Sequence, residues 1–291
     1  CRVVGRDRSA LDGTDEDDSF DGGIGNDTIN GNDGDDTLDG GDGNDSINGG
    51  DGSDGINGGD GMFFEGTEFA DSYIIDYNDN IDYTLTIQSG AGQDSYTLQG
   101  DAPNDRTGAR LDLRGFNIDQ PNGAIVDLTL GSGQIIDDGY GNTEAISGNG
   151  YFRSVRLTQQ DDDFQGSDND EEIRSYAGND TLDGGGGIDE IDFNDRRYSA
   201  VTVDLSDLVN SASGSYDGNA FSYALSNIEN IVGSRDTATG DMLTGDDNDN
   251  RIEGRAGDDT INGGGGDDRL EGDDGDDDLI GGDGDDRLFG G

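Results

Sequence analysis

Large apolar side chains recur every nine residues along three stretches of the chain. The residues between them are mostly Gly, Asp, Asn, Ser and Thr, and an acidic or amide residue stands two places before each apolar one. A short fixed period indicates a solenoid, in which each repeat packs only against its neighbours. The recurring apolar residues are Phe20, Ile29, Leu38, Ile47 and Ile56 in the first stretch, Phe164, Ile173, Leu182 and Ile191 in the second, and Leu243, Ile252, Ile261, Leu270, Leu279 and Leu288 in the third.

Between these stretches apolar and polar residues alternate, which predicts short β-strands. Clusters of Gly, Asn, Asp and Ser separate the strands as turns, and no segment predicts an amphipathic helix. The predicted strands are Tyr73–Tyr77, Tyr83–Ile87, Arg110–Leu113, Ile125–Leu130, Tyr151–Leu157, Val201–Leu205 and Ile228–Val232.

A longer repeat links the apolar stretches with the predicted strands. The sequence from Ala124 to Gly166 is echoed about 77 to 79 residues later, from Thr202 to Gly245. This recurrence argues against separate globular inserts. We therefore expect one all-β solenoid in which tight nine-residue turns alternate with wider ones.

Composition excludes several classes of function. The 291 residues include 68 Asp or Glu, 16 Lys or Arg, one Cys (Cys1) and no His. Without His, a Ser-His-Asp or Cys-His catalytic unit and a His-containing zinc or haem site are impossible. One Cys excludes an internal disulfide and a multi-thiolate metal site. No run of apolar residues is long enough to span a membrane.

The net charge of −52 disfavours nucleic acids and anionic membrane surfaces as partners. Only 29% of the residues are hydrophobic, and a chain of such charge and so few apolar residues is expected to be disordered. A multivalent cation is the obvious means of offsetting the carboxylate repulsion. The sequence therefore predicts folding that depends on bound cations.

Each repeat has the form Gly-Gly-x-Gly-x-Asp-x-U-x, where U is the apolar residue. The glycines permit left-handed backbone angles, so several carbonyl oxygens can turn toward one point, and the Asp adds a carboxylate there. The last three residues form a short strand whose apolar side chain points inward. Calcium takes six to eight oxygen ligands, more than one such loop supplies. Two loops together can supply them.

If two repeats make one full turn, loops 18 residues apart lie directly above one another. This stacking predicts about nine calcium sites. Nine divalent ions would neutralise about 18 of the 52 net negative charges, so the surface would remain anionic. The expected pairs of sixth-position residues are Asp18/Asp36, Asp27/Asp45, Asp36/Asp54, Asp162/Asp180, Glu171/Asp189, Asp241/Asp259, Asn250/Asp268, Asp259/Asp277 and Asp268/Asp286.

The repeats at 40–48 (GGDGNDSIN) and 281–289 (GGDGDDRLF) resemble the calcium-binding repeats of the repeats-in-toxin (RTX), or hemolysin-type, family. The segment from Ile228 to Ser234 is similar to the linking segments of secreted RTX proteins. The resemblance implies a right-handed parallel β-roll with calcium between its turns, exported unfolded through a type I secretion channel.

The resemblance also implies the ligands, which are the sixth-position side chains and the carbonyl groups of the loop glycines. The side chains are those of Asp18, Asp27, Asp36, Asp45, Asp54, Asp162, Glu171, Asp180, Asp189, Asp241, Asn250, Asp259, Asp268, Asp277 and Asp286. The glycines are Gly25, Gly34, Gly43, Gly52, Gly178, Gly187, Gly257, Gly266, Gly275 and Gly284.

Some repeats depart from the pattern. Phe63 stands where Asp is expected, so metal binding in the first array should stop there. Glu171 and Asn250 replace Asp and predict weaker sites. The chain begins with Cys1 and ends inside a repeat, ahead of the place where the family's secretion signal normally lies, which suggests a processed or incomplete piece.

These patterns divide the chain into six segments. They are an N-terminal tail (1–12), a first RTX array (13–61), a wide-turn β segment (62–160), a second array (161–192), a second wide-turn segment (193–240) and a third array (241–291).

We interpret the sequence as an extracellular or cell-surface calcium-binding protein with a structural role, in a fibre or layer formed by end-to-end self-association. One alternative is a non-catalytic secretion and folding module of a larger toxin, protease or polysaccharide-modifying enzyme. Another is a calcium-dependent adhesin or glycan binder, although core packing explains the aromatic residues of the wide-turn segments better. These residues are Tyr73, Tyr77, Tyr83, Tyr96, Phe152, Phe193 and Phe221.

Catalysis is not expected. The run Asp161-Asp162-Asp163 offers the paired carboxylates that glycosidases use, but in so acidic a chain carboxylates are close by chance. We therefore predict no catalytic residue and no enzymatic function.

Overall fold

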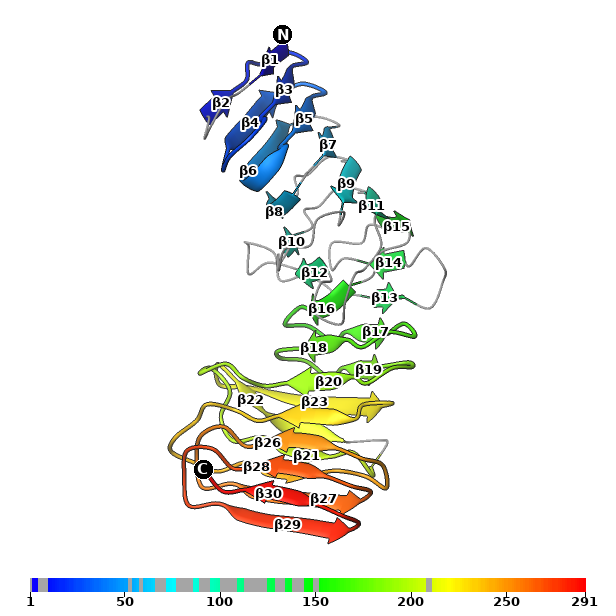
Figure 1. Ribbon diagram of the computed structural model, residues 1–291, viewed down its shortest axis with the longest axis vertical. Coiled ribbons are helices and arrows are strands. Elements are labelled where there is room, and N and C mark those ends of the chain that lie inside the picture. Colours follow the sequence, from blue (N-terminus) through cyan, green and yellow to red (C-terminus); the bar gives the residue numbers. More distant parts are fainter. Residues whose placement is uncertain are drawn as a thin grey trace. The chain divides into compact units, whose positions relative to one another are not determined.

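A computed structural model describes residues 2–4, 10–51, 54–57, 60–65, 72–76, 86–88, 95–99, 109–112, 125–128, 134–137, 144–148, 152–207 and 211–291. Within these ranges every regular element is a β-strand (Figure 1). The chain divides into two compact units, Cys1–Arg156 and Leu157–Gly291. No helix suited to crossing a membrane occurs among the described residues.

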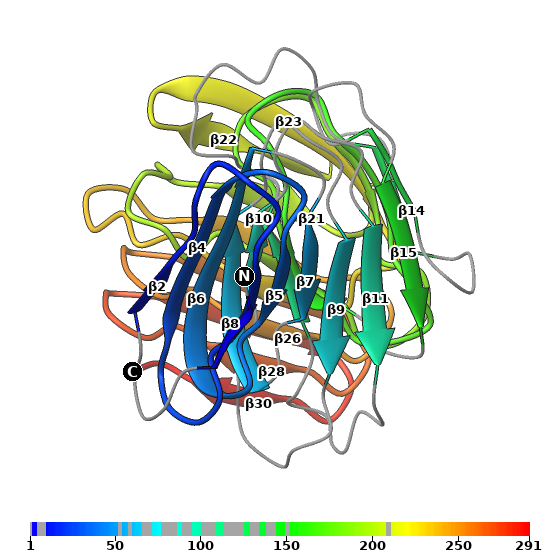
Figure 2. The same ribbon diagram turned by 90° about the horizontal axis from the view of Figure 1, so that it is seen from above.

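The first unit consists mainly of two ladders of parallel strands, and successive strands alternate between them (Figure 2). One ladder contains β1 (Arg2–Val4), β3 (Ser19–Asp21), β5 (Thr37–Asp39), β7 (Gly55–Asn57), β9 (Ser72–Asp76), β11 (Ser95–Gln99) and β15 (Glu144–Gly148). The other contains β2 (Ala10–Asp12), β4 (Thr28–Asp33), β6 (Asp42–Asp51), β8 (Asp60–Glu65), β10 (Thr86–Gln88), β12 (Ala109–Asp112) and β16 (Phe152–Arg156).

The second unit repeats this plan. One ladder contains β18 (Glu172–Arg174), β20 (Glu190–Asp192), β24 (Asn230–Val232), β26 (Arg251–Glu253), β28 (Arg269–Glu271) and β30 (Arg287–Phe289). Facing it lie β17 (Asp163–Gln165), β19 (Thr181–Asp183) and β23 (Asn219–Ser226), and β21 (Thr202–Asp204), β25 (Met242–Thr244), β27 (Thr260–Gly265) and β29 (Asp278–Asp283). Strand β22 (Ala212–Tyr216) joins these two groups through antiparallel pairing.

The register within the arrays is 18 residues, as the sequence predicts. Ser19 pairs with Thr37, and Arg251 pairs with Arg269. The recurring apolar residues of the inner strands point into the roll, as shown by the complete burial of Leu38 and the 1% exposure of Ile47, whereas Leu288 of the last strand is exposed. Because only one large side chain per repeat is buried, each turn contributes a narrow core. The predicted all-β parallel solenoid is confirmed.

The echoed segments form the same structural element in each unit. In the first, β13 (Ile125–Asp127), β14 (Gln134–Asp137) and β15 are antiparallel neighbours. In the second, β21, β22 and β23 are arranged in the same way. The last strand of each set returns to parallel pairing, β15 with β11 and β23 with β19. The wide turns are therefore solenoid turns that contain an additional antiparallel strand.

Each predicted strand has a counterpart, in β9, β10, β12, β13, β16, β21 and β24. Parts of these predictions fall on Tyr77, Tyr83, Leu113, Leu130 and Tyr151, which lie outside the described residues. The sequence did not predict β1 and β2, which lie in the expected N-terminal tail, nor β8, β11, β14, β15, β22 and β23. Strand β22, with the sequence ASGSY, illustrates why, because its small residues give almost no hydrophobic alternation.

Aromatic side chains fill the wide turn of the second unit. Ring centroids of Phe221 and Tyr223 are 4.5 Å apart, and Tyr223 Oη donates a 2.8 Å hydrogen bond to the Tyr176 carbonyl. Phe193 and Phe221, and Phe152 of the first unit, are at most 3% exposed, so these three aromatics belong to the core and cannot line a glycan-binding face. The buried aromatic residues of this cluster are Tyr176 from the second array and Phe193, Tyr198, Tyr216, Phe221 and Tyr223 from the wide turn.

Candidate metal sites between the turns

The structure brings together every pair of sixth-position residues that the spacing predicts. In each pair, Oδ1 of the later residue accepts a hydrogen bond from the backbone N–H of the residue 18 positions earlier, over 2.7–3.0 Å. The nine pairs begin at Asp18, Asp27, Asp36, Asp162, Glu171, Asp241, Asn250, Asp259 and Asp268. The carboxylates therefore form columns along the edges of the roll, with one member per turn.

First-position glycines allow an oxygen-rich space beside these carboxylates. A Cβ on Gly31 would lie less than 3.0 Å from Asp36 Oδ2 and from the carbonyl oxygen of Gly49, one turn further on. Gly263 is crowded in the same way by Asp268 Oδ2 and the Gly281 carbonyl oxygen. Only glycine leaves room here for two oxygens from successive turns.

Fourth-position glycines turn the loop backbone into the left-handed region, where other residues are strained. Gly43 lies in β6, and Gly52 lies outside the described residues. The glycines with φ from 98° to 153° are Gly25, Gly34, Gly178, Gly187, Gly257, Gly266, Gly275 and Gly284.

The second carboxylate oxygen has no hydrogen-bond donor in several loops. The Oδ2 atoms of Asp36, Asp189, Asp259, Asp268 and Asp277 are buried, and none accepts a hydrogen bond. An anionic oxygen that leaves water without a partner costs considerable free energy unless a cation or donor compensates it. These atoms therefore mark where a cation or a hydrogen-bond donor would compensate the buried charge.

The first loops of the arrays differ, because a Ser or Thr that stands four residues before the carboxylate, or seven in the third array, caps it. Thr14 donates from both its backbone N–H and its hydroxyl to Asp18 Oδ2, each over 2.9 Å. Ser234 donates in the same manner to the two oxygens of Asp241, over 2.6 and 3.0 Å. Thr158 and Ser167 cap Asp162 and Glu171 in the second array. Each array thus begins with a loop whose carboxylate has a Ser or Thr donor.

The Asp162/Asp180 pair is the least suited to a cation. Ser175 replaces the first-position glycine, and its hydroxyl contacts both carboxylates: it donates to Asp180 and lies 3.4 Å from Asp162 Oδ2. The Ser175 side chain therefore occupies the space that remains open beside Gly31 and Gly263, and its hydroxyl already satisfies Asp180.

The donor set suits calcium better than a transition metal. No three His, Cys, Asp or Glu side chains converge on one point within the part of the chain that the structure describes. A cation between two turns would therefore take most of its ligands from backbone carbonyls, with the stacked carboxylates completing the set. Calcium accepts six to eight hard oxygen ligands in flexible geometry, whereas transition metals favour imidazole or thiolate groups. The residues present fit calcium.

Burial and neighbouring carboxylates oppose ionisation of the columns when no metal is bound. Burial, followed by the charge of Asp162, raises the pKa of Asp180 to about 8. Burial also raises the pKa of Asp241 to about 6. The pKa of Asp189 is raised as well, by burial and by the charges of Glu171 and Glu229. A cation at these loops would reverse the shifts, because it favours the charged form.

One acidic residue of the columns, Glu229, was not predicted from the sequence. Asn230 pairs with both Glu190 and Arg251, which places Glu229 in line with Asp189 and Asn250. The segment around Glu229 lacks the glycine pattern and was therefore assigned to a wide turn. Its detectable signal is the spacing, because Glu229 stands two places before the buried Ile231, as each loop Asp stands before its apolar residue.

Asn250 provides donors where an aspartate has none. Its Nδ2 donates a 2.8 Å hydrogen bond to the Glu229 carbonyl, and its Oδ1 accepts one from the Asp246 N–H over 2.9 Å. A carboxylate at 250 would face that carbonyl without a proton to donate. Asn at position 250 therefore satisfies the Glu229 carbonyl of the neighbouring wide turn, which Asp could not do.

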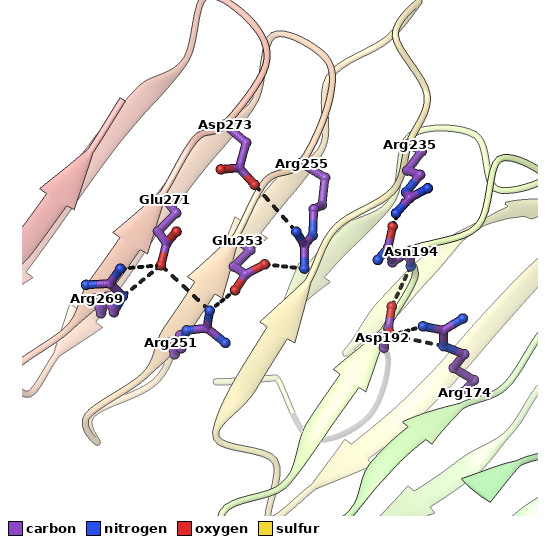
Figure 3. Close-up of polar contacts among 10 residues, drawn as sticks. All are labelled: Arg174, Asp192, Asn194, Arg235, Arg251, Glu253, Arg255, Arg269, Glu271 and Asp273. Atoms are coloured by element: carbon purple, nitrogen blue, oxygen red, sulfur yellow. Dashed lines mark hydrogen bonds and ion pairs between the residues drawn. The ribbon is translucent and has the colours of Figure 1, made fainter. Parts of the chain in front are cut away.

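Arginine side chains partly balance the acidic outer face of the second unit (Figure 3). Arg269 pairs with Glu271 over 2.7 Å, and Arg174 Nε donates to Asp192 over 2.9 Å. Arg251 bridges Glu253 and Glu271 on adjacent strands. These residues flank the inward-pointing apolar positions, so they lie away from the loop carboxylates. Asp192 and Glu253 are buried, whereas the Arg269–Glu271 pair is more exposed and contributes little.

We predict that Gly263→Ala will weaken calcium-dependent folding, because its Cβ would displace Asp268 Oδ2 and the Gly281 carbonyl. Gly265→Ala is the matched control, since the nearest atom to a Cβ there is 3.5 Å away. The calcium concentration at half-folding should rise roughly tenfold or more for Gly263→Ala, a cost of at least about 1.4 kcal/mol. Equal midpoints for the two variants, followed by circular dichroism, would contradict the role assigned to the first-position glycine.

Comparison with known protein families supports the same interpretation. The model of the RTX calcium-binding nonapeptide repeat matches residues 12–47, 30–61, 158–192, 237–270, 244–279 and 262–291. A comparison with curated proteins found no match. Nonapeptide repeats of this family bind calcium. With stacked loops in the predicted register and repeated matches to the family, the chain is an RTX hemolysin-type calcium-binding repeat protein.

Proposed function

We propose that the protein binds calcium between successive turns and folds into a rigid β-roll as it does so, outside the cell and in a structural role. The observation that carries this proposal is the set of buried carboxylate oxygens without donors, each beside a glycine that leaves room for oxygens of the next turn. Without a cation the buried negative charges of this arrangement are uncompensated, and a bound cation would compensate them.

We assign the strongest sites to loops with uncompensated oxygens, those of Asp36, Asp189, Asp259, Asp268 and Asp277. The other sixth-position residues would act as second carboxylates of the stacked pairs, and the fourth-position glycines as carbonyl donors. Bound calcium supplies positive charge between two anionic turns. The chain's own contribution is to hold carboxylates and carbonyls in register and to exclude water from them.

Folding and binding are coupled in this proposal. The net charge of −52 and the narrow core disfavour a compact chain. A ligand that binds only the folded state stabilises it by mass action. Extracellular calcium modules work at about 10⁻⁴ to 10⁻³ M, far above cytosolic calcium. The roll would therefore remain open inside the cell and fold outside.

Support for an extracellular, structural role comes from the family and from the wide turn. RTX repeat proteins are generally secreted. The aromatic side chains of the second unit's wide turn are buried against one another. A wide turn with a packed aromatic core would continue the solenoid as a rigid element. We infer no catalytic role for this turn.

The first test is a calcium titration of the whole chain. In chelator we expect little β-structure by far-UV circular dichroism and a radius of gyration near the unfolded value, about 60 Å for this length. Calcium should produce β-structure and compaction together, while magnesium should do so poorly, because it demands a small octahedral shell. Equal β content and equal size in chelator and in calcium would refute ion-coupled folding.

A second prediction concerns pH when no metal is bound. The pKa of Asp241 is raised to about 6 and that of Asp180 to about 8, so the folded chain holds protons that the unfolded chain releases. Stability from this source is present below about pH 4 and is lost as the pH rises through these values. In chelator, β content should therefore increase as the pH is lowered from about 8 to about 5. A pH-independent signal would contradict this prediction.

A further inference from the structure

The wide turn of the second unit preserves the loop register along one edge of the roll. Strand β24 pairs with β20 before it and β26 after it, so the edge passes from Asp189 to Glu229 to Asn250. Asp189 N–H donates a 2.8 Å hydrogen bond to Glu229 Oε2, the bond that every stacked pair makes across 18 residues in the arrays. Here it spans 40 residues.

The space beside Gly184 has the same composition as in the arrays. A Cβ on Gly184 would lie less than 3.0 Å from Asp189 Oδ2 and from the Asn227 carbonyl oxygen. Asn227 thus supplies the carbonyl that a first-position glycine supplies one turn further on in a regular repeat. Asp189 is fully buried, and its Oδ2 accepts no hydrogen bond. A carboxylate oxygen without a donor therefore faces the wide turn.

Glutamate suits this position because the loop is shorter. Gly184 and Asp189 are five residues apart in the regular loop, whereas Asn227 and Glu229 are two apart. Asn227 makes the tight bend with a φ of 50° and donates a 2.6 Å hydrogen bond to Asp183 Oδ1. The additional methylene of Glu229 lets its carboxylate reach the Asp189 N–H from this shortened loop.

The wide turn places an acidic residue in the column on only one of the two edges of the roll. On the opposite edge the wide turn places Val201 in line with Asp241, and Val201 N–H donates to Asp241 Oδ1 over 2.8 Å. Val201 has no oxygen in its side chain, so the column is interrupted at that point. The same wide turn thus breaks the acidic column on one edge and keeps it on the other.

We propose that Asp189 and Glu229 hold a calcium ion between the 183–189 loop and the Asn227–Glu229 segment, with the Asn227 carbonyl as a further ligand. This inference rests on the proposed function, calcium binding between turns. The ion would join the second and third arrays into one continuous column along this edge.

The test compares Glu229→Gln with Asp217→Asn in the full-length chain. Asp217 lies at the turn between β22 and β23, and Asn tolerates its φ of 49°, so this variant removes one charge from the same wide turn without touching the column. Equilibrium dialysis with radioactive calcium gives the number of bound ions, and hydrogen exchange with mass spectrometry gives local protection.

Glu229→Gln should bind one calcium ion fewer than Asp217→Asn. Exchange at residues 184–189 and 227–230 should accelerate on the order of tenfold or more, with residues 259–286 unchanged. Glu229→Asp should lose the same ion, because its side chain is one methylene shorter. Rescue by Asp, or an unchanged ion count in Glu229→Gln, would overturn the inference.

The unmodified chain provides a second measurement if the variants fold poorly. Exchange at 227–230 should slow over the same calcium range as exchange in the third array. Slow exchange at 227–230 already in chelator, or no response to calcium there while the arrays respond, would also refute this site but leave the proposed function intact. A chain that binds no calcium at all would instead refute the proposed function.

Discussion

The rest of the structure depends on a carboxylate oxygen that is buried between two turns without a hydrogen-bond donor. One oxygen of the later carboxylate in each stacked pair accepts a backbone N–H from the turn before it, and in loops such as those of Asp36, Asp259 and Asp268 the other accepts nothing. Stacking the loops multiplies this cost along the roll. In the proposed function a cation between turns changes the same contact from repulsive to cohesive, so that the stability of each turn would depend on its ions.

Other features of the chain are consistent with this constraint. One apolar residue per repeat gives a core too narrow to hold the turns together alone. The arrays begin with loops whose carboxylates are capped by Thr14, Thr158 or Ser234, where no earlier regular loop provides a partner. The wide turn of the second unit compensates for its interrupted register with a cluster of six buried aromatic side chains. Where the stacked loop carboxylates are fewer, the apolar core is larger.

The sequence was sufficient to predict the solenoid, the 18-residue register and all nine stacked pairs, because a strict period determines which residues become neighbours. It was insufficient where the chain departs from that period. Strands β14, β15, β22 and β23 pair antiparallel, and their partners are not set by the repeat. Glu229 was missed because a shorter loop with a longer side chain reaches the same position. The Ser and Thr caps depend on hydroxyl geometry that spacing does not specify.

The central claim is that calcium lies beside the uncompensated loop oxygens, and anomalous diffraction from crystals grown in calcium tests it most directly. The account predicts anomalous peaks between turns, at roughly 2.3–2.6 Å from Oδ2 of Asp36, Asp259, Asp268 and Asp277. It would be contradicted by well-ordered loops with no anomalous peak, in which those oxygens accept hydrogen bonds from water or from the protein instead.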